Sequence, residues 1–418
     1  MAEIFKGEPG INFRSAAASP SPECAVHAPW WTSEGCVILS PGIFATPRGG
    51  HMVVPKEPTW HRDPHTAAKH DVLRQYLQAW APILLSRNDI VTYAEGFAGP
   101  GIYKGGEAGS PVIAHQVLAG SLRQRAGKRV KMVLVEEDGR RKTELEQQLA
   151  HARENQPGPE LARLETHVTQ GGCHPDLLRN LAQTGSLGHP MFVLLDGFGS
   201  PEVPFALLQQ VARHRSSEVM ITFQPQFLVR FAQKDGTHRA AGDAFFGNSD
   251  WHSVFALPSN EKAPYLRDQY RRTLRAAGFD HSLSFEMIDE KRHLLYLIFG
   301  TSHEKGVEKM KEAMWKVDTT TGVRYCDPKD PDQQVLELTL EPDTGPLRRI
   351  LIEYLRSSPD GFTVAALQRF ALLETVYRPA QVIPALTRLR EEKRITTTAP
   401  GRIVRSTQVT ATHQDALF

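Results

Sequence analysis

Residues 90–111, IVTYAEGFAGPGIYKGGEAGSP, decide the fold that this sequence predicts. Ile90, Val91 and Tyr93 are β-branched or aromatic, which favours a strand, and a cluster of glycines ends the run. Ser110 and Pro111 are typical of a helix start, because the serine hydroxyl can accept from a free N–H and proline at the first position loses no hydrogen bond. The stretch therefore predicts a strand, a glycine-rich turn and a helix.

Glycines fill the turn between these two elements. They let the backbone take positive φ values, and they let a ligand approach the main chain next to the positive end of the following helix. This pattern favours a nucleotide-like cofactor site, with a glycine-rich surface loop that binds nothing as the alternative. Glu95 favours a cofactor site, because a carboxylate at the end of the strand would face the crevice in which a ligand could bind. The candidate cofactor-binding residues here are Glu95, Gly96, Phe97, Gly99 and Gly101.

A second strand, over residues 129–136, also ends in a carboxylate. Its run of Val, Met and Leu is typical of a parallel strand buried on both faces. In nucleotide-binding α/β sheets a carboxylate at the end of the second strand commonly holds a ribose diol, which makes Glu136 a candidate. Glu136 follows Glu95 by about forty residues, whereas the dinucleotide fingerprint has an interval of about twenty. This spacing disfavours a nicotinamide cofactor.

The third and fourth strands also end in residues that suit a ligand site. Residues 166–170 read as a short strand followed by Gly171 and Gly172. Residues 190–195 carry the strongest strand pattern in the chain and run into Asp196, which is followed by another glycine motif. Like Glu95, Asp196 follows an apolar strand and precedes a glycine motif. Two carboxylates are therefore expected at the ends of neighbouring strands.

The later strand patterns fix the fold class. Residues 218–223 read as a fifth strand after a helix, and residues 283–288 and 294–299 are close enough in sequence to form an antiparallel pair. Five βα units followed by such a pair predict an α/β protein with a doubly wound, mostly parallel, Rossmann-like sheet and an antiparallel edge hairpin.

A helix is expected to begin after Asp63, with Pro64 at its first position. Its apolar face carries Leu73, Tyr76, Leu77, Trp80 and Leu84. Lys69 and His70 on this helix are interpreted as a solvated face, with a substrate contact as the alternative.

The C-terminal part is predicted to form a winged helix-turn-helix. Three apolar-patterned helices, the third opened by Pro379, precede a hairpin of residues 394–398 and 402–405. Pro384 is expected to kink the third helix or delay its start. Gln381 and Thr387 are candidates for reading base edges.

The basic excess of the chain belongs to this C-terminal part. The whole chain has a net charge of +2, but residues 345–418 carry eleven Arg or Lys against six Asp or Glu. Such a cluster suits phosphate neutralisation, with a solvated face or a protein contact as the alternative. The candidate nucleic-acid-binding residues are Arg388, Arg390, Lys393, Arg394, Arg402 and Arg405.

Composition excludes several classes of protein. Of the 418 residues 40% are hydrophobic and 23% charged, and no apolar run is long enough to span a bilayer, which favours a soluble, cytoplasmic protein. The four cysteines form no C-x-x-C pair, so neither a zinc site nor a disulfide framework is expected. Cys173 and His174 are adjacent and would point to opposite faces, which disfavours a nucleophile with its base. No metal site is predicted.

The predicted domain organisation follows these patterns. Residues 1–55 form a loosely ordered or disordered extension, 56–326 the Rossmann-like domain, 327–344 a linker, 345–408 the winged helix and 409–418 a tail. Because Met52 precedes the first well-patterned region, an alternative translation start there is open.

Four groups of motifs occur together in this chain: Lys69-His70 with Tyr76-Leu77, Tyr93-x-Glu95-Gly-Phe-Ala-Gly-Pro-Gly-x-Tyr103 with Gly109-Ser110-Pro111, Asp196-Gly-Phe-Gly, and Leu295-Tyr-x-Ile-Phe with Lys311-Glu-x-Met-Trp315. In this combination the chain resembles one known family, the three-Cys-motif partner proteins (TcmP), over residues 56–405. The sequence departs from many relatives at Glu95 and Gly197, where Asp and Pro are expected.

The resemblance implies a central domain like that of class I S-adenosylmethionine (SAM) methyltransferases. SAM would place its amino acid part at residues 95–101, its ribose near Glu136 and its adenine near Gly171. Asp196 would be the catalytic residue, beside the transferred methyl group, where a carboxylate orients an acceptor amine. The implied partners are nucleic acid and a three-Cys-motif protein related to radical-SAM enzymes.

Two classes of function therefore follow from the sequence. The first is a SAM-dependent methyltransferase, or a derivative of one, that acts on or near nucleic acid. The second is a non-catalytic nucleic-acid-binding adaptor that retains the Rossmann-like body, which the missing proline after Asp196 and the basic C-terminal part favour.

Overall fold

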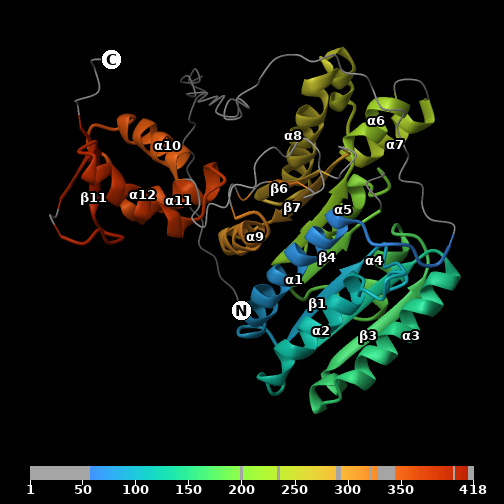
Figure 1. Ribbon diagram of the computed structural model, residues 1–418. Coiled ribbons are helices and arrows are strands. Elements are labelled where there is room, and N and C mark those ends of the chain that lie inside the picture. Colours follow the sequence, from blue (N-terminus) through green and yellow to red (C-terminus); the bar gives the residue numbers. More distant parts are fainter. Residues whose placement is uncertain are drawn as a thin grey trace, which may run out of the picture. The chain divides into compact units, whose positions relative to one another are not determined.

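A mixed sheet with the strand order β3-β2-β1-β4-β5-β7-β6-β8 forms the centre of the chain (Figure 1). Strand β1 pairs in parallel with β2 and β4, and β7 runs antiparallel to both β5 and β6. Within the described sheet β7 alone is reversed, which gives the order and directions of the class I methyltransferase fold. The predicted doubly wound sheet with an antiparallel hairpin is confirmed. The strands are β1 (Ile90–Glu95), β2 (Arg129–Glu136), β3 (Leu164–Gln170), β4 (Met191–Leu195), β5 (Ser217–Phe223), β6 (His281–Ile288), β7 (Leu294–Thr301) and β8 (Arg324–Cys326).

The computed structural model describes residues 57–197, 201–232, 236–288, 293–319, 322, 324–326, 344–398 and 401–412. The predicted N-terminal extension with Met52, Phe198 and Gly199 of the second glycine motif, and residues 327–343 of the predicted linker lie outside these ranges. None of the helices in the described ranges is long and apolar enough to cross a membrane.

Helices cover both faces of the sheet, each with its own hydrophobic core. One face packs against α1, α2, α3 and α9, and the other against α4 to α8. The helices around the sheet are α1 (Pro64–Leu85), α2 (Ser110–Arg123), α3 (Gly139–Asn155), α4 (Asp176–Gln183), α5 (Phe205–Ala212), α6 (Pro225–Phe231), α7 (Gly236–Phe246), α8 (Ser259–Ala277) and α9 (Glu304–Val317), with the 3-10 helices η1 (Pro159–Arg163) and η2 (Asp250–Ala256).

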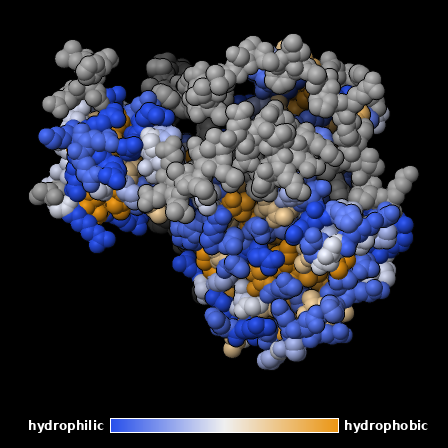
Figure 2. Space-filling model, in the orientation of Figure 1, coloured by the Kyte–Doolittle hydropathy of each residue, from blue (hydrophilic) through white to orange (hydrophobic). Residues whose placement is uncertain are grey.

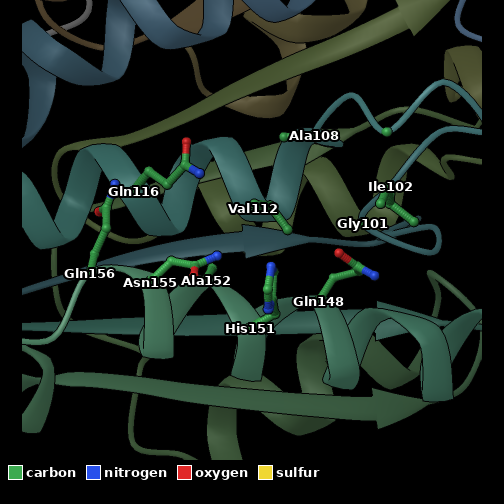
Figure 3. A pocket seen from close by; sticks show the side chains of 11 residues that line it. Gly101, Ile102, Ala108, Val112, Gln116, Gln148, His151, Ala152, Asn155 and Gln156 are labelled. Atoms are coloured by element: carbon green, nitrogen blue, oxygen red, sulfur yellow. The ribbon is translucent and has the colours of Figure 1, made fainter.

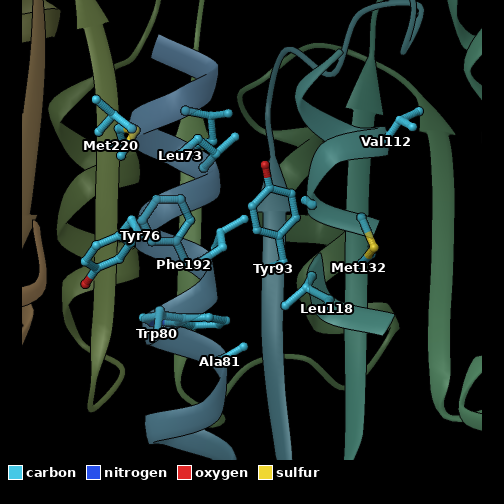
Figure 4. Packing of buried hydrophobic residues seen from close by; sticks show 14 of the residues in the cluster. Leu73, Tyr76, Trp80, Ala81, Tyr93, Val112, Leu118, Met132, Phe192 and Met220 are labelled. Carbon is cyan, nitrogen blue, oxygen red and sulfur yellow. The ribbon is translucent and has the colours of Figure 1, made fainter. Parts of the chain in front are cut away.

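Helix α1 is fixed to the centre of the sheet by aromatic packing (Figure 4). Tyr76 and Trp80 of α1 contact Phe192 of β4 at ring-centroid distances of 5.4 and 6.0 Å, and Tyr93 of β1 stacks on the same ring at 6.0 Å. Large buried aromatic side chains contribute strongly to such an interface, because each removes a large apolar area from water. The helix face predicted from the sequence is therefore the face that is buried.

The C-terminal unit has three helices and a small antiparallel sheet. Its helices are α10 (Gly345–Arg356), α11 (Val364–Glu374) and α12 (Pro379–Glu391), and its sheet has the order β10-β11-β9. The strands are β9 (Phe362–Thr363), β10 (Ile395–Thr397) and β11 (Gln408–Ala411).

One detail of this unit differs from the prediction. The strand that pairs with residues 395–397 is β11, not residues 402–405, so the loop of the hairpin is longer and the predicted tail contains a strand. Of the two effects expected of Pro384, a delayed helix start does not occur, because α12 begins at Pro379. Pro384 is exposed, so the carbonyl that loses its helical donor can accept from water instead.

A buried carboxyl group joins α1 to the middle of the sheet. Glu218 of β5 accepts hydrogen bonds from the hydroxyls of Tyr76, at 2.6 Å, and Thr301, at 2.8 Å. A Cβ atom on Gly306, in the first turn of α9, would lie 2.4 Å from this carboxyl group, so the glycine makes room for it. Burial raises the pKa of Glu218 to about 7.

Replacing Glu218 by Gln tests this group through the pH dependence of stability. A carboxyl group whose pKa rises to about 7 on folding stabilises the fold while it is protonated, and this contribution is lost as the pH rises through its folded pKa. In urea titrations, the wild type should therefore lose unfolding free energy relative to Glu218→Gln as the pH rises. The loss should be on the order of 3 kcal/mol between about pH 5 and about pH 9. Glu154→Gln, the same change at an exposed position, is the control. A difference between Glu218→Gln and the wild type that does not change with pH would contradict the raised pKa of Glu218.

Candidate active site

The glycine-rich loop after β1 is held in a compact turn by main-chain bonds. Gly99 and Gly101 have φ values of +66° and +76°, where side chains with a Cβ atom are strained. The Gly109 N–H donates to the carbonyl of Gly101 at 2.8 Å, which closes the loop just before α2 begins. A Cβ atom on Gly101 would lie 2.9 Å from Leu145, whereas one on Gly99 would meet nothing closer than Trp60 at 4.0 Å. Gly99 is therefore the open position of the loop, and Gly101 is a packing position.

The sequence predicted that Glu95 faces an open crevice. Glu95 instead lies buried beneath the loop. Its carboxyl group accepts from the Tyr93 hydroxyl at 2.6 Å and the Ser110 hydroxyl at 2.8 Å. Tyr93 shares the same face of β1, since the two residues are two apart in a strand. Burial raises the pKa of Glu95 to about 8 although both hydroxyls lower it. Ser110 thus anchors the first turn of α2 to β1, and Gly109 takes the N-cap position expected for Ser110.

Glu136 at the end of β2 lies directly beside the loop. One oxygen of its carboxylate accepts from the Gly99 N–H at 2.8 Å, and the other accepts from the Asp138 N–H at 3.0 Å. The guanidinium of Arg141 is 3.9 Å away. A carboxylate has about four acceptor positions, and these two hydrogen bonds leave spare positions on a side chain that is 7% exposed. Gly99 and Glu136, two of the candidate cofactor-binding residues, are therefore in direct contact at one edge of the sheet.

The other predicted cofactor residues lie around the same strand ends. Gly96 is a packing position, because a Cβ atom there would lie 2.5 Å from the sulfur of buried Cys173. The Phe97 ring packs against Gly197, which follows Asp196. Gly171 donates its N–H to the carbonyl of Glu136 at 3.0 Å, which brings the end of β3 to the end of β2.

Asp196, immediately after β4, is held by two side chains. Lys69 of α1 donates to one carboxylate oxygen, and the Thr222 hydroxyl of β5 donates to the other at 2.6 Å. The side chain of Asp196 keeps 20% of its surface accessible. Burial raises the pKa of Asp196, but the Lys69 ammonium and the Thr222 hydroxyl outweigh burial and hold it below its ordinary value. Asp196 is therefore an ionised acceptor with a defined orientation and an open side.

The interpretation of Lys69 and His70 as a solvated face is wrong, because both are buried, with 6% and 3% of their surface exposed. Burial, assisted by the nearby ammonium of Lys69, lowers the pKa of His70 to about 3, so its ring is neutral. The ring lies 5.7 Å from that of Tyr103, which comes from the glycine-rich loop. Burial raises the pKa of Tyr103, and the negative charge of Asp196 acts in the same direction.

The sequence contained a signal for these missed residues. Lys69 precedes Leu73 by four residues and Tyr76 by seven, and His70 precedes Leu73 by three and Leu77 by seven. Helical spacing therefore places both on the apolar face of α1. A charged residue on a buried helix face needs a partner, and the partner of Lys69 is Asp196, at the carboxyl end of β4.

A surface groove lies behind the glycine-rich loop, between α2 and α3 (Figure 3). Its volume is about 160 Å³, and the side chains of Gln116, Gln148, His151 and Asn155 line it together with Gly101. Of the residues predicted to bind a cofactor, only Gly101 lines this groove. The carboxylates of Glu136 and Asp196 are not part of it. Among the described residues, no group of three or more His, Cys, Asp or Glu is placed to hold a metal ion.

The six basic residues predicted to bind nucleic acid fall into two sets. On and after α12, Arg388 pairs with Glu391 at 3.1 Å and Arg390 donates to the carbonyl of Gly401 at 2.7 Å, while Lys393 and Arg394 follow the helix.

In the loop before β11, Arg402 and Arg405 are exposed on either side of Val404, which is 48% exposed. Neither arginine forms a side-chain hydrogen bond or ion pair with the residues that the structure describes. The face of the molecule in Figure 2 shows a mostly hydrophilic surface over the C-terminal unit, at the left.

Gln381 cannot read base edges, contrary to the prediction. It is 6% exposed, and its side-chain oxygen accepts from the Arg378 N–H at 2.8 Å, which caps the start of α12. Thr387 is half-buried and donates to the carbonyl of Ile383 at 2.9 Å. The exposed face of α12 consists mainly of Ala380, Pro384 and the paired Arg388.

Comparisons with known proteins give similarity in structure but not in sequence. No model of a protein family matches the chain, and no curated protein matches its sequence. The solved structures to which it is similar include EvdMO1, with 15% identity over 56% of this chain and 42% of that one, at a TM-score of 0.30. The chain thus spans less than half the length of EvdMO1.

Two further structures cover more of their own length. Protein LPL1258 from Legionella pneumophila shows 13% identity over 62% of this chain and 92% of that one, with a TM-score of 0.36. The arsenic(III) SAM methyltransferase of Chlamydomonas reinhardtii shows 13% identity over 51% of this chain and 62% of that one, with a TM-score of 0.30. These values are too low to transfer a substrate or a cofactor from any of the three to this chain.

Proposed function

We propose that this chain is a SAM-dependent methyltransferase that acts on or near nucleic acid. The observation that carries the proposal is that Gly99 bonds Glu136 at the carboxyl ends of β1 and β2, while Asp196 follows the carboxyl end of the adjacent strand β4. In open α/β sheets, ligands bind in the crevice outside this edge, where the strand order reverses. Here the order reverses between β1 and β4.

The residues at this edge suit SAM in their donors and acceptors. Glu136 offers acceptor positions to the ribose hydroxyls, and the open position at Gly99 lets the amino acid part approach the main chain. Asp196 carries a negative charge that favours a sulfonium nearby, and the Lys69 ammonium offsets part of that charge. When bound, SAM supplies an electrophilic methyl group.

The chain's own residues then orient the acceptor. The ionised carboxylate of Asp196 accepts a hydrogen bond from an acceptor amine, while Lys69 and Thr222 prevent the carboxylate from rotating away. Glu95, whose pKa is raised to about 8, stays largely neutral at pH 7 and fixes the start of α2. Positioning and removal of water supply most of the rate enhancement in this scheme.

The alternative is a nucleic-acid-binding adaptor without catalysis. Two observations favour the adaptor. Lys69 already occupies one oxygen of Asp196, and no proline follows Asp196. In either case we propose that the C-terminal unit is a winged helix that contacts nucleic acid. By resemblance to the three-Cys-motif partner proteins, a radical-SAM-like protein with three cysteines is the proposed partner.

Titration calorimetry with SAM and with its demethylated product tests the cofactor site. Gly99→Val should abolish binding, because its side chain would fill the open position of the loop. Gly127→Val is the matched control, since Gly127 also has a positive φ, +76°, and no neighbour within 4 Å, but lies in the turn before β2. If titration of the wild-type protein with millimolar SAM gives no heat of binding, the result would favour the adaptor function. Unchanged affinity in Gly99→Val would refute the site assignment.

Salt titration tests the nucleic-acid contact of the C-terminal unit. Each phosphate contact adds about −0.9 to the slope of log affinity against log salt on duplex DNA, so alanine at both Arg402 and Arg405 should flatten the slope by up to about two units. The charge-matched control replaces Arg213 and Arg215, which are exposed just before β5. Fluorescence anisotropy at several salt concentrations gives the slopes. Equal slopes for wild type and the Arg402/Arg405 variant would indicate that this loop binds protein instead.

A further inference from the structure

Lys311 of α9 is a buried cation whose hydrogen-bond partners come from the C-terminal unit. Only 2% of its surface is exposed. Its ammonium donates to the carbonyls of Ala371 at 3.1 Å and Tyr377 at 3.3 Å, and at shorter range to those of Leu372 and Thr375. All four carbonyls belong to the end of α11 and to the turn that leads into α12.

These carbonyls need such a donor. The last four carbonyls of a helix have no partner inside the helix, and Ala371 and Leu372 are among the last four residues of α11. A cation at the C-terminal end of a helix is further stabilised by the helix dipole. Burial, assisted by the positive charge of Arg271, lowers the pKa of Lys311 to about 7, and the negative charge of Glu374 acts in the opposite direction. Lys311 therefore caps a helix that belongs to the other unit.

Trp315, one turn further along α9, completes the contact. Its indole N–H donates to the carbonyl of Val376 at 3.0 Å, and its ring lies 5.7 Å from that of Tyr377. The guanidinium of Arg378 lies over the same ring at 5.2 Å. Trp315 is part of the hydrophobic core of the C-terminal unit, although it comes from a helix of the sheet domain. The core of this unit is thus incomplete without α9.

We infer that α9 is a docking site for the turn between α11 and α12, and that Lys311 and Trp315 keep the C-terminal unit bound to the sheet domain without help from the connecting chain. The turn is then unavailable to any other partner, and nucleic acid or protein can reach this unit only through its remaining faces, including the loop with Arg402 and Arg405. This inference does not rest on the proposed function.

A cleavable connection tests the inference directly. A recognition site for a specific protease is inserted between residues 327 and 343 of the full-length chain, and the cleaved protein is run on size-exclusion chromatography. The two wild-type fragments should elute together. Lys311→Met leaves four buried carbonyls without their charged donor, so the affinity between the fragments should fall by about a hundredfold or more. Lys316→Met is the control on the same helix, because Lys316 is exposed and donates to Gln75 of α1 instead.

A second variant keeps the test decisive if Lys311→Met does not fold. Trp315→Phe retains an aromatic ring in the core but removes the hydrogen bond to Val376, and should weaken the association by about tenfold. Circular dichroism establishes that both fragments are folded. Wild-type fragments that separate on cleavage while folded would overturn the inference. So would folded variants at position 311 or 315 whose fragments associate as tightly as those of the wild type.

Discussion

The ion pair between Lys69 and Asp196 is the interaction on which the candidate site depends. Burying two charges costs several kcal/mol for each ion unless their geometry is good and their remaining hydrogen bonds are made. Here Thr222 supplies the further bond to the carboxylate. Because Lys69 lies in the second turn of α1, this pair fixes where the helix begins over the sheet. The preceding segment then crosses the glycine-rich loop, where the Lys104 N–H donates to the carbonyl of Trp60 at 2.9 Å.

Three carboxyl groups at neighbouring strand ends are given different properties by their surroundings. Glu95 is buried with neutral hydroxyl donors, and its pKa rises to about 8. Asp196 has a cation beside it, and its pKa falls. Glu136 is held by two main-chain N–H groups and keeps spare acceptor positions. Separating the protonation of similar groups in this way lets one act as a structural anchor while another carries charge.

The sequence predicted the sheet well because its signals are local. Buried parallel strands such as residues 190–195 have continuous apolar runs, and the antiparallel pair β6 and β7 has few residues between its strands. The partners of the polar groups were harder to predict, because they come from segments far apart in the sequence. Lys69 and Asp196 are 127 residues apart, and a helical pattern says which residues share a face but not which of them meets a charge.

The same limit explains the corrections in the C-terminal unit. From the sequence alone, Gln381 is a candidate for reading base edges if the third helix enters a major groove. Its side chain instead caps the start of that helix, an arrangement that depends on the turn before it. The expected second strand of the hairpin, residues 402–405, contains the β-branched residues Ile403 and Val404, but residues 408–411 pair with β10. Pattern alone does not choose between two short candidates, because the pairing is set by the length of the loop.

Hydrogen exchange measured with and without the demethylated product of SAM tests whether the carboxyl edge of β1, β2 and β4 binds the cofactor. If it does, main-chain amides in residues 96–101 and 136–138 should exchange more slowly when the ligand is added, with no change in α12. Protection confined to the groove between α2 and α3, or to the C-terminal unit, would contradict binding at this edge.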